Sequence, residues 1–459
     1  MDGIFAALGQ FLRSPAFKFF MIGALIIVLL IPLFLVAVLI GERMQRAESV
    51  RQDVAGEWGG SQTINGPLLI VPYSVRRVIA QGDKTIEEVI ERRAVFLPQR
   101  LDINGKAATK VLHRSIYDVA VYSSALDFEG SFAAPDMSTV ATDVQSVRWR
   151  DAVLALAVSD VSGLKTAAAL TVDGTHKLDF EPSLGIPVAN SNGIHVRLGN
   201  LPGLVATANA ADGAALKAFT FKFQLNLNGS LQLTFAPAAQ ETTVNLSSDW
   251  PNPSFTGAFL PNDRKVENDG FTARWQVPHL ARSIPQSWSL ADRDIERLTN
   301  YAFGVRFFVP VDFYQLVSRA SKYAMMFVAT AFMAVFLLEL RSSRQVHPVQ
   351  YFFVGLTIIF FYVLLLSLAE QIGFLPAYLI ASIATGGLLS LYVAKVQHSL
   401  AKGLVMGGIF FALYGLLYMI LQLEDYALLA GAIAGFAMLA VVMFSTLNVD
   451  WSGKARTST

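Results

Sequence analysis

Residues Ile22–Ile40 read IGALIIVLLIPLFLVAVLI, a run of apolar side chains without a single charge. A helix rises about 1.5 Å per residue and the hydrocarbon core of a bilayer is about 30 Å thick, so roughly 20 such residues cross a membrane. The uncharged stretch Phe19–Ile40 therefore predicts a transmembrane helix. It is longer than the apolar core of a cleaved signal peptide, which favours an anchor that stays attached over a signal that is removed.

Five more apolar stretches crowd the C-terminal part of the chain. They predict transmembrane helices at about 319–340, 351–369, 371–394, 403–423 and 426–449. Because backbone groups in lipid have to bond internally, each crossing segment is expected to be helical. The alternative, buried helices of a large soluble protein, would leave this part of the chain too little polar surface.

Basic residues fall on one side of this predicted topology. Lysine and arginine favour the cytoplasmic side of a membrane. The basic residues that flank the spans are Arg13, Lys18, Arg341, Arg344, Lys395, Lys402, Lys454 and Arg456, and the acidic Glu370, Glu424 and Asp425 occupy the other side. Both termini are therefore predicted to be cytoplasmic, and residues 41–318 are predicted to be periplasmic.

The long segment between the first two spans carries the signals of a β-rich domain. Asn-Gly and Asp-Gly pairs favour tight turns between strands, because both residues tolerate positive φ. They occur at 65–66, 104–105, 173–174, 192–193, 212–213, 228–229 and 269–270. The spacing of these pairs predicts a meandering antiparallel sheet or sandwich.

The predicted fold class is thus an α+β membrane protein. One N-terminal transmembrane helix precedes a large β-rich periplasmic domain, and a bundle of five transmembrane helices follows it. The predicted divisions are residues 1–40 for the N-terminal segment with the span 19–40, 41–318 for the β-rich domain, 319–449 for the bundle and 450–459 for a cytoplasmic tail.

One hairpin can be predicted to its register. Apolar side chains occupy the odd positions of both Phe219–Leu225 and Leu231–Phe235. A two-residue turn would pair the odd positions of one strand with the even positions of the other. A loop with an odd number of residues, such as the three residues Leu227–Gly229, is needed to place both apolar sets on one face. This arrangement would pair Leu225 with Leu231.

The borders of the β-rich domain also have predicted structures. The stretch Gly41–Gly60 predicts a solvated helix that continues from the first span. Near the other border, Phe303–Val309 predicts a last strand, and Leu290–Thr299 predicts a short helical patch. Asp312 is predicted to cap a helix that runs unbroken from Phe313 into the second span.

The residues that usually carry chemistry form no recognisable site in the sequence. Cysteine is absent, which excludes a thiol nucleophile, a cysteine metal ligand and a disulfide. The six histidines form no close ligand pair, and no nucleophile elbow or phosphate-binding loop is present. No catalytic residue, metal or cofactor is therefore predicted. The near-balance of acidic and basic residues in the outer segment argues against nucleic acid as a partner.

Three polar residues near the membrane borders are candidate functional groups. Glu339 lies at the inner end of the second span, and Glu370 lies at the outer end of the third. Ionisable groups inside membranes often have functions, although at these two positions each carboxylate can also reach water. His347 belongs to an inner loop, where the simpler interpretation is a loop that ends before a helix starting near Pro348. The span interiors contain no charged residue, which argues against an ion-coupled transporter.

Glycines in the last spans predict close helix packing. Gly403 and Gly407 are four residues apart, as are Gly431 and Gly435. Small residues at this spacing let helices approach closely in lipid. Packing within the bundle and a homo-oligomer interface are both compatible with this spacing.

Aromatic residues and prolines gather near the end of the outer segment. They are Trp250, Pro251, Pro253, Phe255, Phe259, Trp275 and Trp288. The prolines exclude a central strand at this point. The rings either line a groove for a peptide, glycan or lipid headgroup, or fill the core of the sheet.

The residues 248–261, SDWPNPSFTGAFLP, resemble a signature of the CreD-like family of cell-envelope integrity inner-membrane proteins. So do RASKYA at 319–324, HPVQY at 347–351, LSLAE at 366–370 and GPLL at 66–69. The resemblance covers nearly the whole chain. It implies an inner-membrane protein of Gram-negative bacteria that is associated with a sensor-kinase system, envelope stress and tolerance of cell-wall-directed agents. The family has no established catalytic residues to carry over.

These observations favour a non-enzymatic membrane protein that supports or senses the integrity of the cell envelope. Its expected partners are the lipid bilayer and, beyond it, other envelope proteins, peptidoglycan or lipid headgroups, with a homo-oligomer also compatible. A periplasm-facing enzyme acting on cell wall or lipid is one alternative. A transporter of small solutes or lipids is the other.

Overall fold

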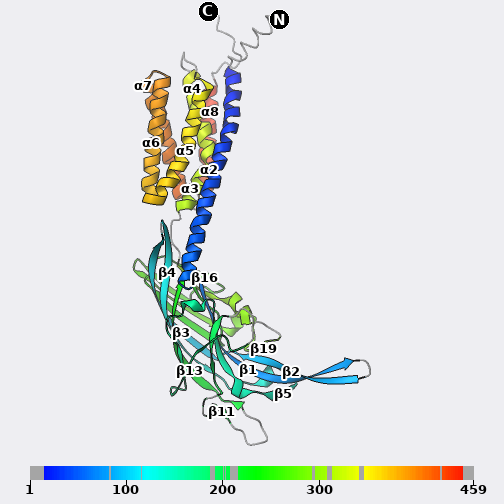
Figure 1. Ribbon diagram of the computed structural model, residues 1–459. Coiled ribbons are helices and arrows are strands. Elements are labelled where there is room, and N and C mark those ends of the chain that lie inside the picture. The colour runs from blue at the N-terminus through cyan, green and yellow to red at the C-terminus, as the bar shows by residue number, and fades with distance from the viewer. Residues whose placement is uncertain are drawn as a thin grey trace, which may run out of the picture. The chain divides into compact units, whose positions relative to one another are not determined.

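The computed structural model describes residues 15–81, 84–114, 116–186, 192–199, 201, 203–206, 215–291, 295–307, 313–340, 346–423 and 426–447. Contacts divide the chain into two units (Figure 1). One contains Met1–Glu48 and Val311–Thr459, and the other contains Ser49–Pro310. The first unit is helical where it is described, and the second consists mainly of β-sheet.

The helical unit follows the hydropathy of the sequence closely. The helices are α2 (Pro15–Glu57, which enters the second unit), α3 (Phe313–Lys322), α4 (Ala324–Leu340), α5 (Pro348–Ile372), α6 (Phe374–Val396), α7 (Leu400–Gln422) and α8 (Ala427–Thr446). Five of them are long and apolar enough to cross a membrane by themselves, and α3 with α4 forms a bent pair that brings the total to six in the described chain. The predicted continuation of the first span beyond Ile40 is present, since α2 reaches Glu57.

The prediction of an unbroken helix from Phe313 into the second span is wrong. The axes of α3 and α4 differ by 46°. The Ser321 hydroxyl donates to the carbonyl of Ser318 at 2.9 Å, and the amide of Tyr323 bonds to Ala320 rather than one residue further back. A side-chain bond into the backbone ladder and a tightened turn both bend helices. The predicted cap Asp312 lies outside the described residues.

The apolar surface of the helices is typical of lipid contact. Some large side chains on α2, α7 and α8 are at least 67% exposed, and they include Phe20, Phe34, Leu404, Phe436 and Phe444. A water-soluble protein rarely exposes apolar patches of this extent. In a bilayer the same side chains would face hydrocarbon.

The second unit contains two large sheets. The ten-stranded sheet has the order β16-β20-β14-β1-β6-β10-β9, with β2 and β5 also paired to β1 and β19 paired to β2. Its strands are β1 (Gln62–Gln81), β2 (Lys84–Phe96), β5 (Val144–Val147), β6 (Val153–Val158), β9 (Glu181–Pro182), β10 (Gly193–Arg197), β14 (Gln232–Phe235), β16 (Pro253–Gly257), β19 (Ser287–Ser289) and β20 (Phe303–Phe307).

The eight-stranded sheet has the order β17-β18-β15-β3-β4-β13-β7-β8. Its strands are β3 (Arg100–Arg114), β4 (Tyr117–Phe132), β7 (Ala169–Val172), β8 (His176–Asp179), β13 (Phe219–Ser230), β15 (Glu241–Ser248), β17 (Asp263–Glu267) and β18 (Gly270–Pro278). A separate pair joins β11 (Val205–Ala206) to β12 (Ala215–Leu216). Most pairings are antiparallel, but β1 with β14 and β15 with β3 are parallel.

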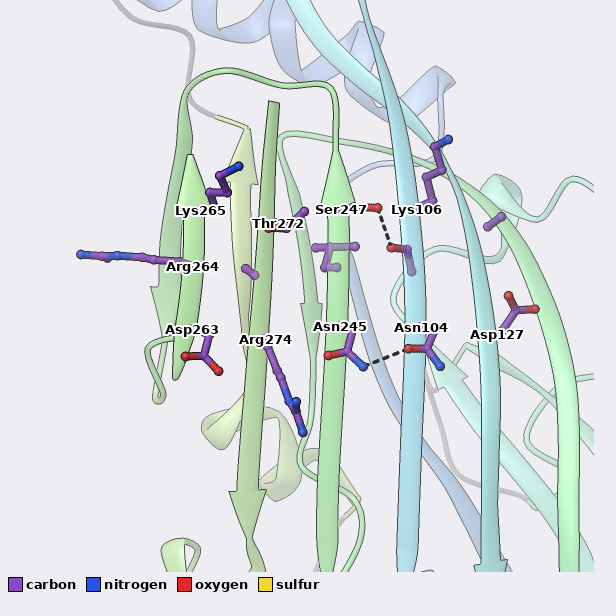
Figure 2. A pocket seen from close by; sticks show the side chains of 14 residues that line it. Asn104, Lys106, Asp127, Asn245, Ser247, Asp263, Arg264, Lys265, Thr272 and Arg274 are labelled. Atoms are coloured by element: carbon purple, nitrogen blue, oxygen red, sulfur yellow. Dashed lines mark hydrogen bonds between the residues drawn. The ribbon is translucent and has the colours of Figure 1, made fainter. Parts of the chain in front are cut away.

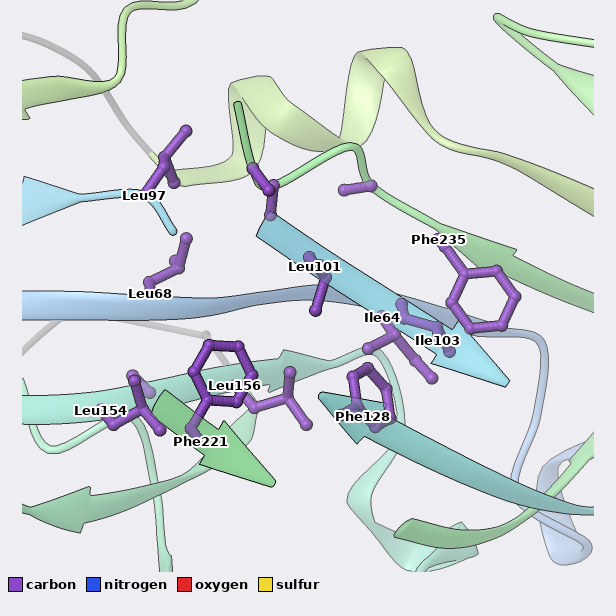
Figure 3. Packing of buried hydrophobic residues seen from close by; sticks show 14 of the residues in the cluster. Ile64, Leu68, Leu97, Leu101, Ile103, Phe128, Leu154, Leu156, Phe221 and Phe235 are labelled. Carbon is purple, nitrogen blue, oxygen red and sulfur yellow. The ribbon is translucent and has the colours of Figure 1, made fainter. Parts of the chain in front are cut away.

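One apolar core draws side chains from both sheets (Figure 3). Ile64, Leu68, Leu154 and Leu156 come from the ten-stranded sheet, and Leu101, Ile103, Phe128 and Phe221 come from the eight-stranded sheet. Burying one such side chain stabilises a fold by roughly 1.5–3 kcal/mol before conformational entropy is counted. On the eight-stranded sheet, the face that turns away from this core carries polar residues.

The hairpin predicted at 219–235 is wrong, because the first strand pairs with another strand than the one predicted. The prediction of its buried face is right. The odd-numbered side chains Phe219 to Leu227 are buried in β13. The strand pairs along its full length with β4, which places Leu225 opposite Leu126. At Leu231, whose φ is +59°, the chain leaves this sheet, and β14 joins the other one.

The predicted turns are only partly present. Asp173-Gly174 connects β7 to β8 with φ values of +48° and +69°, and Asp269-Gly270 connects β17 to β18. In contrast, the pairs at 65–66, 104–105 and 228–229 lie inside strands, where the prediction of turns is wrong. Packing explains the glycine at position 105, because a Cβ there would lie 2.8 Å from Leu126 Cδ2 and 2.9 Å from Leu246 Cδ1. The pair at 192–193 precedes and begins β10, and the pair at 212–213 lies outside the described residues.

The last part of the β-rich unit agrees with prediction in outline. Strand β20 covers Phe303–Phe307 of the predicted stretch, and the rest of that stretch is outside the described residues. The predicted helical patch is a 3₁₀ helix that begins later, at Ile295, and ends at Tyr301. The prolines lie at an edge as predicted, since β16 begins at Pro253 and is the terminal strand of its sheet.

Candidate binding groove on the eight-stranded sheet

A groove of about 630 Å³ crosses the polar face of the eight-stranded sheet. Its lining residues come from β4, β3, β15, β18 and β17 (Figure 2). We call this hollow the sheet groove. Its volume lies within the range of about 300–1,000 Å³ that is usual for ligand sites.

Strand alternation explains why polar side chains reach this face. Along β15, Val244 and Leu246 are buried in the core while Asn245 and Ser247 point the other way. Along β18, Trp275 is buried, whereas its neighbour Arg274 is exposed. Successive side chains of a strand point to opposite faces, so a single sequence builds both the core and the groove.

The register places the groove residues in two rows across the strands. The first row is Ala125, Lys106, Ser247, Thr272 and Lys265. Its middle members have short side chains, whereas the two lysines have long ones. The floor is therefore low over Ser247 and Thr272, with a lysine on each side (Figure 2).

The second row is Asp127, Asn104, Asn245, Arg274 and Asp263. Two amides in it are fixed by hydrogen bonding, since Asn245 Nδ2 donates to Asn104 Oδ1 at 2.9 Å. Asp127 Oδ1 accepts from Gln224 Nε2 at 3.0 Å. This row presents amide, guanidinium and carboxylate groups. It lies two residues along each strand from the first row, a distance of about 7 Å.

The cations of the groove differ in how they are held. Lys265 pairs with Glu267 at 2.8 Å, and this carboxylate raises the pKa of the lysine. Both side chains are exposed, so the pair is weak and screened by salt. Arg264 points away from the groove and lies over the Phe255 ring at 5.9 Å (Figure 2). Within the described strands, neither Lys106 nor Arg274 has an ion-pair partner.

Further hollows extend the polar surface along the same strands. One of about 300 Å³ shares Lys106, Ser247, Lys265 and Thr272 with the sheet groove and reaches Asp249. Another, of about 500 Å³, is lined by residues such as Gln240, Gln276 and His279 near the opposite end of β15. The eight residues of β15 span about 26 Å, so the face offers an extended polar track.

The predicted aromatic candidates do not line this groove. Trp250, Trp275 and Trp288 are buried, with Trp275 fully enclosed. The Phe255 ring meets the rings of Phe271 and Trp275 edge-on at 5.7 and 5.9 Å. The Phe259 ring meets that of Phe303 at 5.9 Å, Pro253 is half-buried and Pro251 is exposed. Most of this set packs at the edge of the core, away from the polar face.

Glu339 occupies a buried polar cluster within the helical unit. It is 6% exposed, and its carboxylate is paired with the Lys18 ammonium. It also accepts from the Tyr351 hydroxyl at 2.9 Å and from the amide of Val346 at 3.0 Å. The cluster thus connects α2, α4 and α5 through one carboxylate.

The other two polar candidates make simpler contacts than Glu339 does. Glu370 accepts from the Tyr314 hydroxyl at 3.1 Å, which links α5 to α3. His347 caps α5, since its Nδ1 accepts from the amide of Val349 at 3.3 Å while Gln350 bonds back to the amide of His347. The capping box explains the residue types at the start of this helix.

The glycines lie at helix contacts of unequal tightness. A Cβ on Gly403 would be 2.4 Å from Ala394 Cβ, and one on Gly407 would be 2.5 Å from Ser390 Oγ, both on α6. A Cβ on Gly431 would be 2.9 Å from Tyr323 Cε1, whereas Gly435 has Met326 Sδ at 3.9 Å as its nearest neighbour.

This difference provides a matched pair of variants. Gly403→Ala is expected to destabilise the helical unit by about 1–3 kcal/mol, because the new methyl group would force α6 and α7 apart. Gly435→Ala is expected to be neutral or slightly stabilising, because it has room and alanine favours helix. Thermal unfolding in detergent checks both, and equal midpoints for the two variants would contradict the packing described here.

A group of hydroxyls in the bundle was not predicted from the sequence. The Tyr378 hydroxyl donates to the carbonyl of Tyr414 at 2.6 Å, and the hydroxyls of Thr385 and Tyr414 are 2.9 Å apart. The Phe361 ring packs against both tyrosine rings. These contacts join α5, α6 and α7, as polar side chains commonly do in membranes. A search of the sequence for charged residues does not find these hydroxyl groups, because each of them is neutral.

Among the described residues, no group of three or more histidine, cysteine or acidic side chains is placed to hold a metal ion. The functional groups of the sheet groove are amides, hydroxyls, cations and carboxylates on a rigid β framework. Such a set is suited to binding a polar molecule by hydrogen bonds and charge.

Comparison with known proteins identifies the family. The family described as "Inner membrane protein CreD" matches residues 14–452. The chain is also 30% identical over 442 residues to "Inner membrane protein CreD" of Escherichia coli (strain K12), covering 96% of this chain and 94% of that protein. The match includes the apolar helices and both sheets. The chain therefore belongs to the CreD family of inner membrane proteins.

Proposed function

We propose that this protein supports or senses cell-envelope integrity by binding an envelope component at the sheet groove, rather than by catalysing a reaction. In this proposal the β-rich unit faces the periplasm and the apolar helices anchor it. The sheet groove is the observation that carries the proposal, because it gathers polar groups from five strands over one hollow.

The distribution of charge supports the proposed orientation. Lys395 and Lys402 lie at the α6–α7 connection, whereas Glu370 lies near the α5–α6 connection at the other end of the same helices. Lys18 lies in the first turns of α2. By the positive-inside rule these lysines belong on the cytoplasmic side, and residues after the first span would then be periplasmic.

The chemistry of the groove supports binding over catalysis. Its lining supplies hydrogen-bond donors and acceptors together with Lys106, Lys265 and Arg274, but its residues include no histidine beside the Ser247 hydroxyl to act as a base. Loops usually carry catalytic groups, whereas these side chains stand on paired strands. A rigid polar face is better suited to recognising a repeating or extended envelope structure.

A complementation experiment tests the proposal. Cells that lack the protein would receive the wild type, a groove variant carrying Lys106→Gln and Lys265→Gln, or Lys222→Gln on the same sheet as a matched control. The groove variant is expected to leave the cells sensitive to a cell-wall-directed agent, while the control restores tolerance. Full restoration by a groove variant that is present at normal levels would contradict the proposed function.

A further inference from the structure

We infer that the sheet groove recognises its ligand through a single oxyanion, a carboxylate or a phosphodiester, seated over Ser247 and Thr272. This inference rests on the proposed function and specifies the ligand chemistry of the same site. It follows from the placement of Lys106, Lys265 and Arg274 around the groove floor, with carboxylates on either side of the lysine row.

The backbone positions of three cations lie around Ser247 and Thr272, although the Arg274 side chain extends away from Thr272 in the structure (Figure 2). Lys106 and Lys265 belong to one row with three strand spacings between them, or about 14 Å at the backbone. Arg274 is two residues from Thr272 on the same strand, about 7 Å away. Lysine and arginine side chains of this length can converge over the two hydroxyls between them.

The floor offers suitable donors for an oxyanion. The hydroxyls of Ser247 and Thr272 can donate hydrogen bonds. Ser247 also lies near the carbonyl of Gly105 at 3.4 Å, a long contact that a stronger acceptor can displace. Hydrogen bonds from neutral donors to an anion are roughly twice as strong as those to a neutral acceptor.

The acidic residues limit the charge of the ligand. Asp127 and Asp263 occupy the two ends of the second row, and Asp249, Glu267 and Asp269 line the smaller hollow on the other side of the lysine row. A molecule with one anionic group can sit over Ser247 and Thr272 between these carboxylates. A polyanion that follows the sheet would meet at least one of them and be repelled.

The remaining surface requires the rest of the ligand to be polar. The hollow is large enough for a small molecule or one unit of a polymer, and its walls carry the amides of Asn104 and Asn245. Their mutual hydrogen bond leaves the Asn104 amide nitrogen and the Asn245 oxygen for a ligand. Hydroxyl or amide groups next to the oxyanion would complete the fit.

Two soluble probes distinguish the sources of such a group. Muramyl dipeptide carries one carboxylate and represents the cell wall, whereas glycerophosphoglycerol carries one phosphodiester and represents a lipid headgroup. Binding of each to the full-length protein in zwitterionic nanodiscs would be measured by calorimetry. The muramyl dipeptide with its carboxylate converted to an amide serves as the neutral control.

At least one charged probe is expected to bind, and the double variant Lys106→Gln, Lys265→Gln is expected to raise its Kd by about tenfold or more. Lys222→Gln should change the Kd by less than about twofold, since it lies outside the groove. The amidated dipeptide should bind more weakly than its parent if the wall fragment is the ligand. Added salt should weaken binding of the charged probe.

Two results would overturn the inference. One is the absence of binding by either probe at millimolar concentration, and the other is equal binding by the wild type and the groove variant. If in addition the groove variant fails in the complementation experiment, the proposed function stands and only the ligand chemistry is wrong. If that variant restores tolerance fully, the proposed function itself is wrong.

Discussion

Replacing Glu339 with alanine is expected to lower the free energy of unfolding of the helical unit by about 3–5 kcal/mol, the usual cost of breaking a buried ion pair from one side. The substitution would leave the Lys18 ammonium without its counter-ion, and its side chain is only 19% exposed. It would also remove the acceptor for the Tyr351 hydroxyl and the Val346 amide. A buried donor without a partner costs about 1–3 kcal/mol.

Unfolding in detergent, followed by circular dichroism, measures this loss. Glu370→Ala is the matched control, because it removes a carboxylate that accepts one bond, from Tyr314, and that is only half-buried. Its expected cost is about 1 kcal/mol. Adding Lys18→Met to Glu339→Ala should recover part of the loss, since removing both partners leaves no uncompensated charge. Equal midpoints for the two single variants would contradict the connecting role assigned to Glu339.

Replacing Trp275 with alanine is expected to destabilise the β-rich unit by about 3–5 kcal/mol, as large aromatic deletions in cores do. The ring has no exposed surface and lies 5.8 Å from the Phe303 ring and 5.9 Å from the Phe255 ring. Its loss would open a cavity between residues of both sheets. Trp275→Phe should cost less, because it keeps an aromatic ring in the same space.

The same experiment separates a core role from a binding role for the aromatic residues. Leu280→Ala is the surface control, since Leu280 is 84% exposed and should change stability by less than about 0.5 kcal/mol. Midpoints of thermal unfolding for the three variants give the comparison. A stable Trp275→Ala protein would show that the ring is not part of the core described here.

The sequence predicted the parts of this structure that depend on local patterns. Uncharged runs located the long apolar helices, because a helix that crosses a membrane has to be both long and apolar. Alternation predicted which side chains of β13 are buried, because the period of a strand is fixed. It could not identify the partner strand, since the same odd positions would suit either Leu231–Phe235 or the distant β4.

Contacts between residues far apart in the sequence also explain why the candidate sites could not be predicted in full. Glu339 stood out as a charge at the end of a span, but no local pattern connects it to Lys18, which is 321 residues away. The sheet groove was missed for a similar reason. Lys106, Ser247 and Lys265 each resemble an ordinary solvent-facing strand residue. Only the strand order β17-β18-β15-β3 brings them into one row.

The most direct test of the proposed orientation uses the absence of cysteine from the chain. A single cysteine would be placed at Lys222 on β13, whose side chain is 68% exposed, or at His398 in the α6–α7 connection, which is also exposed. A maleimide reagent that cannot cross the inner membrane would be added to spheroplasts before and after they are permeabilised. The proposed orientation predicts that Lys222→Cys reacts in both samples and that His398→Cys reacts only after permeabilisation. Labelling of both positions in intact spheroplasts, or the reverse order, would contradict a β-rich unit that faces the periplasm.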